Sequence, residues 1–566
     1  MIKTLITAAA LLLVFGALVF AADINQAPTS QSGAGATPAA FEVNVATLPD
    51  FSPADAKAYR EPPEPRNPYY TEDQVRAMKK YAITAAPISR PEDGAQNLGA
   101  PKITQLGDTP GAFVNFAGSN EGLSCSGLTP SDMGIAVSPG AGGWVVQVTN
   151  ACLQISNKTG GALVQKTLDS LFNWAAGTFT FDPRITYDFV KNRFIATSST
   201  IDSSGVAWID VAASATSNPN GTWHTYHLST PTGTTVADYP TLGQSWANDK
   251  FNAGIFVCFN QFTSSGFTSD YCYYLPKAKI YTGAGFSFFF NFNFSANGVL
   301  LSSIQPVNVS QLDEEPRTEY AVTSFDTNGA NGLVLWSFAN TVDQSGTPGP
   351  SITGVVVSTP SSYSYPADAD NAGFCSNCIE TLDNRISGMV QYAGGRIFPT
   401  LDTANGGTSA VLGWVVRPFL NDNGSGTCTG NFADACPAIT GATVETEFCD
   451  YCGSGSLGAW FGTIAADEEG NWTMFANFSD TSVSPGTFYD SNRVSWQKPF
   501  HDAGTFSCVN NEPYTQTRWG DYTAAAPDYN NHTQETAIWG SGMYLPSSNL
   551  WGTCIAATRY GSVELP

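Results

Sequence analysis

The sequence predicts an all-β protein made of repeated four-stranded antiparallel sheets. Short runs of alternating apolar residues are joined by tight turns, and turn-forming residues are plentiful, with 54 glycines and 34 prolines. Aromatic residues make up 12% of the chain and charged residues only 13%, as is typical of many short strands. Helical periodicity is nearly absent, so the sheets must bury their faces against one another.

The clearest sheet covers residues 181–228. An alternating strand that contains Ile185 and Tyr187 leads into a turn rich in Asp, Lys and Asn, and a second strand begins at Arg193. A third and a fourth strand follow two further turns, and the fourth ends near Leu228. Because one such sheet cannot bury both faces, radial stacking of several sheets into a β-propeller is the expected arrangement.

Degenerate versions of this pattern recur along residues 111–566, which we take as one propeller domain of about seven four-stranded blades. The last pattern contains the Arg518–Tyr522 segment and ends with a strand near Arg559. The ring closes most simply if an N-terminal strand completes this last blade.

The N-terminus has the pattern of an export signal. Lys3 supplies a positive charge, residues 8–20 are apolar, and Ala21 with Ala22 fits a signal-peptidase site. Residues 1–22 are therefore predicted to be a signal peptide, and the protein to be secreted or held at the cell surface. An uncleaved anchor is the alternative, although the apolar run is shorter than the ~20 residues of a spanning helix.

Residues 23–110 form a Pro- and Ala-rich extension or linker. Its one helical pattern runs from Glu72 to Tyr81, with Thr71 placed to cap the first turn and lysines in the last turn. We consider two alternatives for this helix. It packs on the propeller or on a neighbouring molecule, or it belongs to a free solvated tail.

The twelve cysteines of an exported chain indicate disulfides. Two CxxC pairs leave open a zinc site or a redox pair, but an oxidising compartment favours disulfides. The expected pairs are local: Cys125–Cys152, Cys258–Cys272, Cys375–Cys378, Cys428–Cys436, Cys449–Cys452 and Cys508–Cys554.

The net charge of −23 excludes nucleic acid and anionic membrane surfaces as partners, because both would repel this chain. No second long apolar run follows the signal, so no membrane span is expected after its removal. Calcium is the cofactor that remains compatible with this charge, although no acidic cluster has EF-hand spacing. The candidate clusters are Asp313–Glu315, Asp368 with Asp370, and Asp467–Glu469.

Seven motifs between residues 112 and 560 resemble the sialidase-like β-propeller superfamily, and more closely a group of secreted bacterial propeller proteins without an assigned activity. In chain order they are LTPSDMGIAV with VVQVTN, FDPRITYDFVKNRF, SNPNGTW, DYPTLG, TLDNRISGMVQY, AADEEGNWTMF and TRWGDYTAAAPD. The resemblance implies the propeller fold and, for sialidases, three arginines that grip a carboxylate beside a tyrosine nucleophile. Arg184, Arg193, Arg385 and Arg518 are present, but their spacing assigns none of them to such a triad.

The turns also depart from the sialidase Asp-box. The glycine and the tryptophan of that motif are present, as Gly221 with Trp223 and as Gly470 with Trp472, but the spacing between the motif's residues differs. No Ser-His-Asp pattern is supported either, so we assign no catalytic residue. The protein is expected to be a binding or structural module for a glycan or an extracellular protein. A sialidase-type glycoside hydrolase and a self-assembling surface-layer or filament protein are the alternatives.

The candidate ligand-binding residues are charged and aromatic side chains at the expected strand entrances, where a propeller lines its central channel. The densest group is the Arg518–Tyr522 segment, in which an Arg–Asp pair that locks neighbouring blades is the competing interpretation. The full set is Arg184, Tyr187, Asp188, Asp238, Tyr239, Asp383, Arg385, Arg518, Trp519, Asp521 and Tyr522.

Overall fold

The sheet predicted over residues 181–228 is present in the computed structural model of the chain. Its four strands are β8 (Phe179–Asp188), β9 (Arg193–Ile201), β10 (Ala207–Ser214) and β11 (Thr222–Ser229). They pair antiparallel in chain order, and Asp188 faces Arg193 across the first hairpin. Asn192 takes a left-handed backbone conformation in that turn, with φ of 55°, which asparagine tolerates better than most residues.

The structure describes residues 27–51, 67–88, 114–120, 130–140, 142–150, 152–175, 178–245, 254–309, 318–339, 341, 350–372, 374–421, 438–450, 452, 457–467, 472–491, 494–499, 518–529, 536–547 and 550–560. The predicted signal peptide therefore lies outside the described residues. Within them, none of the helices has the length and apolar character that a membrane span requires.

Three further antiparallel sheets have four strands each. The first consists of β4 (Gly134–Val137), β5 (Trp144–Val148), β6 (Cys152–Asn157) and β7 (Ala162–Thr167). The second consists of β28 (Gly458–Ala466), β29 (Trp472–Ser479), β30 (Gly486–Ser491) and β31 (Val494–Pro499). The third consists of β32 (Ala524–Tyr529), β33 (Thr536–Ser547), β34 (Leu550–Tyr560) and β3 (Val114–Asn120). An N-terminal strand thus completes the last sheet, as expected.

The middle of the chain forms one larger sheet of three antiparallel units. The first unit contains β12 (Val236–Gln244), β13 (Gly254–Thr263), β14 (Gly266–Pro276), β15 (Phe286–Ala296) and β16 (Val299–Leu300). The second contains β17 (Gln305–Val309), β18 (Glu319–Ser324), β19 (Ala330–Ala339) and β20 (Ser351–Tyr363). The third contains β23 (Val390–Ala393), β24 (Arg396–Ile397), β25 (Thr400–Asn405), β26 (Thr408–Leu420) and β27 (Ile439–Asp450). A separate hairpin pairs β21 (Ala369–Asn371) with β22 (Cys375–Ile379).

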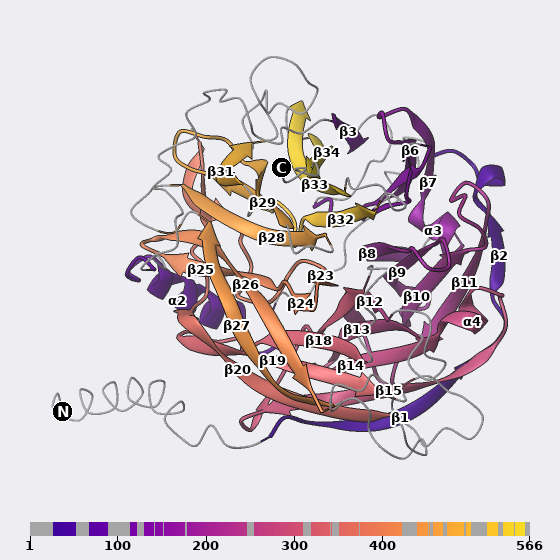
Figure 1. Cartoon of the computed structure of the whole chain (residues 1–566), viewed down its shortest axis with the longest axis horizontal. Helices are drawn as coiled ribbons and strands as arrows, with labels where there is room; N and C mark the ends of the chain where they lie inside the picture. Colours follow the sequence, from indigo (N-terminus) through magenta and orange to yellow (C-terminus); the bar gives the residue numbers. More distant parts are fainter. Residues whose placement is uncertain are drawn as a thin grey trace, which may run out of the picture.

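Parallel pairing of the innermost strands joins these three units. β17 pairs with β12 at Asn308 and Gln244, and with β23 from Val307 to Val309. Figure 1 shows the sheets following one another around a common centre in chain order. The chain is therefore nearly all β, and the division into about seven four-stranded blades stays a prediction.

The extension predicted to be a linker contains two strands that lie on the outside of the ring (Figure 1). β1 (Thr29–Thr37) pairs antiparallel with β15, and β2 (Phe41–Asn44) pairs antiparallel with β11. A 3-10 turn, η1 (Val45–Thr47), follows. Gly33 and Gly35 let β1 approach the aromatic strand β15, because a Cβ at these positions would come within 2.5 Å of the Phe290 ring and 2.6 Å of the Phe288 ring.

The predicted helix is present as α2 (Glu72–Ala82). Thr71 and Gln74 form a capping box, with acidic residues in the first turn and lysines in the last turn. The helix is packed on the propeller: the Lys79 ammonium pairs with Asp368, and Ala82 packs on Ala367 and Ala404. The other helices are short, namely α3 (Leu168–Leu171) and α4 (Lys277–Ile280).

The hydrophobic core lies between the faces of neighbouring sheets. Between β8–β11 and β12–β15, for example, Ile195, Tyr226, Leu242 and Phe259 are each at most 1% exposed. Burial of each such side chain is worth about 1.5–3 kcal/mol, so a sheet that is unstable alone becomes stable between two neighbours.

A left-handed residue recurs either in the segment that leads into the first strand of each unit or at the fourth residue of that strand. Such residues lie at Asp132, Asp182, Tyr239, Ser303, Leu382, Phe461 and Gly520, each with positive φ. In several cases a side chain from the preceding unit accepts a hydrogen bond from the left-handed residue's own N–H. The Asp182 N–H donates to Asn150 Oδ1 at 2.8 Å, and the Tyr239 N–H donates to Asp182 Oδ2 at 3.2 Å. These contacts lock one unit to the next.

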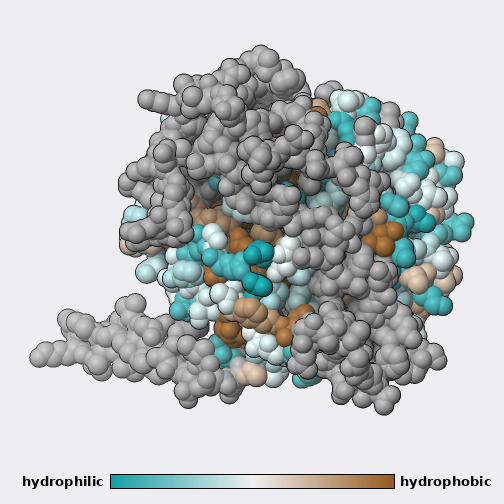
Figure 2. All heavy atoms as spheres, in the orientation of Figure 1, coloured by the Kyte–Doolittle hydropathy of each residue, from teal (hydrophilic) through white to brown (hydrophobic). Residues whose placement is uncertain are grey.

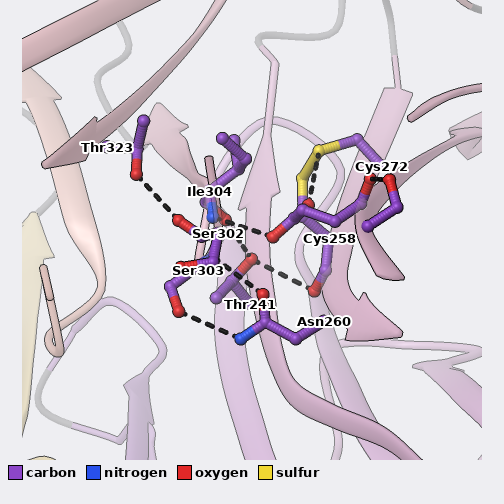
Figure 3. The surroundings of a disulfide bond; sticks show 10 residues. Thr241, Cys258, Asn260, Cys272, Ser302, Ser303, Ile304 and Thr323 are labelled. Carbon is purple, nitrogen blue, oxygen red and sulfur yellow. Dashed lines mark hydrogen bonds between the residues drawn. A yellow bond between two sulfur atoms is a disulfide. The ribbon is translucent and has the colours of Figure 1, made fainter. Parts of the chain in front are cut away.

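The disulfide between Cys258 and Cys272 joins facing positions of β13 and β14 (Figure 3). Hydrogen bonds beside it continue into the next unit. Thr241 Oγ1 donates to the Ile304 carbonyl at 2.7 Å, and the Ser303 N–H donates to Asn260 Oδ1 at 2.8 Å. The disulfide therefore stiffens a sheet whose polar groups position the start of β17.

Three of the six expected disulfides are present, namely Cys258–Cys272, Cys375–Cys378 and Cys449–Cys452. No cysteine among the described residues is free. Cys152 and Cys554 are also disulfide-bonded. Their expected partners Cys125 and Cys508, and the pair Cys428–Cys436, lie outside the described residues.

Candidate functional site

The starts of the innermost strands bring charged and aromatic residues together at the centre of the ring. We call this group the axial cluster. It contains three arginines, two buried tyrosines and five buried aspartates. Its members are Asp132, Asp182, Arg184, Asp238, Tyr239, Asp383, Arg385, Arg518, Asp521 and Tyr522. On the face seen in Figure 2, hydrophilic and hydrophobic described residues lie beside one another near the middle of the view.

Arg184, on β8, is 1% exposed and lies between two tyrosine rings. Its guanidinium carbon is 3.3 Å from the centre of the Tyr522 ring and 5.2 Å from that of Tyr239. Its N–H groups donate to the carbonyls of Pro240, at 3.4 Å, and Ser387, at 3.2 Å. Arg184 therefore links three segments of the chain through cation–π contacts and backbone acceptors.

Arg385 and Asp383 form a buried bidentate pair. Arg385 Nε and Nη2 donate to Asp383 Oδ1 and Oδ2 at 2.7 and 2.6 Å. Burial alone would raise the pKa of Asp383, but the adjacent guanidinium outweighs burial and holds that pKa below its usual value. The Arg385 guanidinium also lies over the Tyr239 ring, 4.8 Å from its centre.

Arg518 and Asp521 form the ion pair that the sequence suggested, with 3.0 Å between Nη1 and Oδ1. Arg518 also lies 3.7 Å from the Glu380 carboxylate, in the segment that follows β22. The pair therefore connects the last sheet with a distant part of the ring, which agrees with the interpretation that it locks neighbouring units.

Asp132, Asp182 and Asp521 each bring one carboxylate oxygen within 4.8 Å of the other two. Burial, reinforced by the neighbouring carboxylates Asp238, Asp132 and Asp521, raises the pKa of Asp182 well above its usual value. Both oxygens of Asp132 accept hydrogen bonds, Oδ1 from the Asp521 N–H at 2.7 Å and Oδ2 from Asn150 Nδ2 at 2.6 Å. Protein donors thus satisfy much of this group, whose oxygen ligands would otherwise suit calcium.

Asp238, on β12, takes part in no ion pair within the described part of the chain. It is 7% exposed, and burial raises its pKa to about 7, with Asp521 adding to the shift while Arg385 and Arg518 oppose it. A carboxyl group with this pKa exchanges its proton near neutral pH, so Asp238 can either donate or accept a hydrogen bond from a bound molecule.

Two of the predicted site residues lie elsewhere. Asp188 is at the far end of β8, where Lys277 Nζ donates to its Oδ2 at 2.8 Å and the Tyr281 hydroxyl donates at 2.6 Å. Tyr187 packs edge-on against Phe189 and Phe194 beside a small cavity at that end of the innermost strands. The alternating sequence pattern correctly predicted that both residues lie on a strand. It could not predict that they lie at the end of β8 away from the axial cluster.

Trp519 is 1% exposed and belongs to an apolar cluster that includes Met133, Ile135 and Trp460. Its ring faces are therefore covered by protein in this structure, as expected for a core aromatic residue. Arg193, considered for an arginine triad, donates instead to the carbonyls of Lys191 and Asn192 in its own hairpin.

The predicted calcium clusters give no grouped ligands among the described residues. Asp368 pairs with Lys79, and Asp370 Oδ1 accepts a hydrogen bond from the Asn377 N–H at 2.7 Å. Residues 313–315 and 468–469 lie outside the described residues, and Asp467 is buried, with 5% of its surface exposed. The other close group of acidic and thiol residues contains Asp270 with Cys258 and Cys272, whose sulfurs are joined to each other.

Sequence reasoning missed the carboxylates Asp132, Asp182 and Asp326, and missed Asn67. Asp132 and Asp182 stand in the quoted motifs LTPSDMG and FDPRITYD, each at the recurring left-handed position, so their repetition was the available signal. Asn67 lies in the N-terminal extension, and nothing in its local pattern indicates a contact with the ring.

No protein-family model matches the chain, and no curated protein matches it. Among solved structures, the chain is similar to an exo-β-1,3-galactanase from Phanerochaete chrysosporium with galactose, at 10% identity and a TM-score of 0.27, over 64% of this chain and 80% of that one. It is also similar to a putative exo-β-1,3-galactanase from Bifidobacterium bifidum s17, at 12% identity and a TM-score of 0.25, over 54% and 93%.

A third similar structure is the GH43_1 enzyme from Xanthomonas citri complexed with xylose, at 10% identity and a TM-score of 0.28, over 76% of this chain and 98% of that one. These identities and TM-scores carry no residue role from those enzymes to this chain.

Proposed function

We propose that the protein is a secreted or cell-surface binding module whose axial cluster recognises a neutral glycan. The observation that carries this proposal is that all three axial arginines are already engaged by protein acceptors. Arg184 donates to carbonyls, Arg385 is held by Asp383, and Arg518 is paired with Asp521. A guanidinium in such a pair is not available to grip the carboxylate of an acidic sugar, so a sialidase-type site is disfavoured.

Charge favours a neutral, hydroxyl-rich ligand. Because burial raises the pKa of Asp182 and of Asp238, the five aspartates roughly balance the three arginines of the axial cluster, which therefore offers an anionic ligand no excess positive charge, whereas sugar hydroxyls can bond to its carboxyl groups in either protonation state. Among the described residues, neither Asp182 nor Asp238 takes part in an ion pair, and Asp238 is the more exposed of the two, at 7% against 1%, so it is the expected contact.

Binding of oligosaccharide panels to the wild type and to Asp238→Asn tests the proposal. Neutral oligosaccharides should bind the wild type, and Asp238→Asn should weaken binding by about tenfold or more, because one bond to a charged acceptor is worth about 1.5–3 kcal/mol. Asp202→Asn, in an exposed turn, is the matched control and should bind like the wild type. Tighter binding of a sialylated oligosaccharide than of its neutral counterpart would contradict the proposal.

A glycan-cleaving enzyme is the second candidate, and the pKa of about 7 at Asp238 favours it. A glycoside hydrolase needs a protonated carboxyl group and an ionised one on either side of the scissile bond, roughly 5–10 Å apart. Release of the aglycone from aryl glycosides, abolished by Asp238→Asn but not by Asp202→Asn, would establish catalysis in place of simple binding.

We also infer an extracellular location and seven blades. The disulfides support the location, since such bonds persist in oxidising compartments. The seven left-handed residues at successive strand starts support the blade count. Self-assembly through the N-terminal arm, the third alternative, would require β1 and β2 to leave the sheets of their own chain, to which they are hydrogen-bonded here.

A further inference from the structure

Asn67, from the N-terminal extension, inserts its side chain between residues of the ring. Its Nδ2 lies 3.2 Å from Asp326 Oδ2, 2.9 Å from Tyr365 Oη and 3.0 Å from Asp383 Oδ2. The Tyr365 hydroxyl donates its own proton to Asp326 Oδ1, so its oxygen is free to accept. Three acceptors therefore converge on one amide nitrogen.

The orientation of this amide is fixed by its other end. Asn67 Oδ1 accepts hydrogen bonds from the N–H groups of Tyr69 and Tyr70, both at 2.9 Å. The opposite orientation would place a carbonyl oxygen against two carboxyl groups and an amino group against two N–H donors. The pocket formed by Asp326, Tyr365 and Asp383, which we call the amide pocket, therefore receives a hydrogen-bond donor.

Further contacts hold the rest of this segment against the ring. The Tyr69 hydroxyl donates to the Leu300 carbonyl at 2.8 Å, and the Tyr69 ring meets Phe267 edge-on with 5.2 Å between centres. At the other end of the segment, the Ile88 N–H donates to Asn405 Oδ1 at 3.0 Å. Residues 67–88 are thus bound much as a ligand is bound, by the half-buried Asn67 amide and flanking aromatic contacts at one end, and by the Lys79–Asp368 pair and the packing of Ala82 along α2.

The amide pocket shares an atom with the axial cluster. Asp383 Oδ2 accepts from both Asn67 Nδ2 and Arg385 Nη2, and Arg385 in turn lies over Tyr239. Burial, with Asp383 adding to the effect, raises the pKa of Asp326 to about 7. Two carboxyl groups held this close need a donor between them, which an amide supplies without adding charge.

We propose that the amide pocket is a binding site for a primary carboxamide with an aromatic residue two positions after it, and that the chain fills it with its own Asn67, so that residues 67–88 act as an intramolecular ligand. A consequence, which rests on the proposed function, is that this segment regulates access to Asp383 at the edge of the axial cluster. The pocket itself requires no glycan, so it can be tested independently.

The first test is native-state proteolysis of the full chain with trypsin, which can cut at Arg76 on the exposed side of α2. Asn67→Asp removes the donor and adds a negative charge beside Asp326 and Asp383, and should speed cleavage at Arg76 about tenfold or more, because the segment detaches more often. Asn67→Ala should also speed cleavage at Arg76, but by a smaller factor, because it adds no charge. Asn44→Asp is the matched control, since Asp caps η1 as well as Asn does.

The second test adds a labelled, N-acetylated peptide of residues 67–74 to each full-length protein. The peptide should bind the Asn67→Asp protein at least tenfold more tightly than the wild type, whose pocket is filled, and a peptide carrying Asp in place of Asn67 should lose this binding. Circular dichroism and the unfolding midpoint check that the variant ring is folded. Wild-type cleavage rates in Asn67→Asp, or equal binding of the two peptides, would overturn the proposal. Neither readout involves a glycan, so such a failure would leave the proposed function intact.

Discussion

The backbone N–H of Asp521 donates a hydrogen bond to Oδ1 of Asp132, an atom that lies 389 positions earlier in the chain. The distance is 2.7 Å, and both residues are buried. Asp132 precedes the first strand of the first sheet and Asp521 precedes the first strand of the last sheet. The bond therefore joins the two ends of the ring at its centre.

Removal of Arg518 should destabilise the ring. Arg518→Ala removes the cation that pairs with the buried Asp521 and lies 3.7 Å from the half-buried Glu380, and loss of one partner of a buried pair costs about 3–5 kcal/mol. Chemical unfolding of both proteins measures the difference. Arg417→Ala is the matched control, because Arg417 is 57% exposed, lies 3.7 Å from Glu445 and should contribute at most about 1 kcal/mol. Equal losses from the two variants would show that Arg518 does not lock the ring.

The raised pKa of Asp238 predicts a pH dependence of stability. Its pKa is about 7 in the folded chain and 3.8 ordinarily, so the folded state holds a proton that the unfolded state releases between these values. The stabilisation of the folded state by this bound proton is complete below pH ~4 and disappears as the pH rises through about 7. Asp238→Asn should therefore make the unfolding free energy fall less steeply over this window, and the decline that remains is due to other buried carboxyl groups with a raised pKa, among them Asp326 and Asp210. Unfolding curves measured from pH 4 to 8 check this, and an unchanged slope would contradict it.

The buried pair of Lys277 and Asp188 should matter for stability with the opposite pH dependence. Lys277 Nζ donates to Asp188 Oδ2, to Gln244 Oε1 at 2.9 Å and to the Ser245 carbonyl at 2.6 Å. Burial tends to raise the pKa of Asp188, but Lys277 and the hydrogen bonds lower it below its usual value. Its stabilisation is therefore present above pH ~4 and is lost as the pH falls through the folded pKa.

Lys277→Met should accordingly cost about 3–5 kcal/mol at neutral pH, since it leaves a buried carboxylate unpaired. Lys279→Met, two positions away on the exposed side of α4, is the control and should change little. A variant at Lys277 that unfolds at the wild-type denaturant concentration would show that Asp188 finds other partners.

The disulfides should differ in their contributions. Cys258 and Cys272 are 14 positions apart, and closing a loop of that length is worth about 3 kcal/mol by the chain-entropy relation. Cys375 and Cys378 are 3 positions apart, so their bond restricts the unfolded chain less. Thermal unfolding of the two Cys→Ala double variants should show the larger loss for Cys258 with Cys272, and the reverse order would contradict this account.

The strands could be predicted because their information is local. Alternation and turn residues placed β8 to β11 within a few positions, and Thr71 with its following acidic residues placed α2. β1 was not predicted, because its sequence TSQSGAGAT has no apolar face of its own. It is a strand only because the phenylalanines of β15 provide a surface that its glycines fit.

The site was predicted less completely because it depends on contacts between distant segments. Arg184, Asp238 and Tyr239 were identified from their place at strand entrances, and the chain does bring them together. Trp519 stands between Arg518 and Asp521 in its own motif, yet it packs in an apolar cluster with residues of two other sheets and not in the axial cluster. Gln147, whose amide donates to Ser541 Oγ at 2.6 Å and whose oxygen accepts from Thr553, joins the first and last sheets, and nothing near it in the sequence indicates this role.

The pairing of β3 with β34 also sets a time scale for folding. The Thr553 hydroxyl donates to the Ser119 carbonyl across 434 positions, so the partner of β3 leaves the ribosome long after β3 itself. At about 5–20 residues per second, that delay is roughly 20–90 s. Throughout this interval β3 presents unpaired edges that invite pairing with other chains. We therefore expect closure of the last sheet, which joins segments 434 positions apart, to be a slow step of folding.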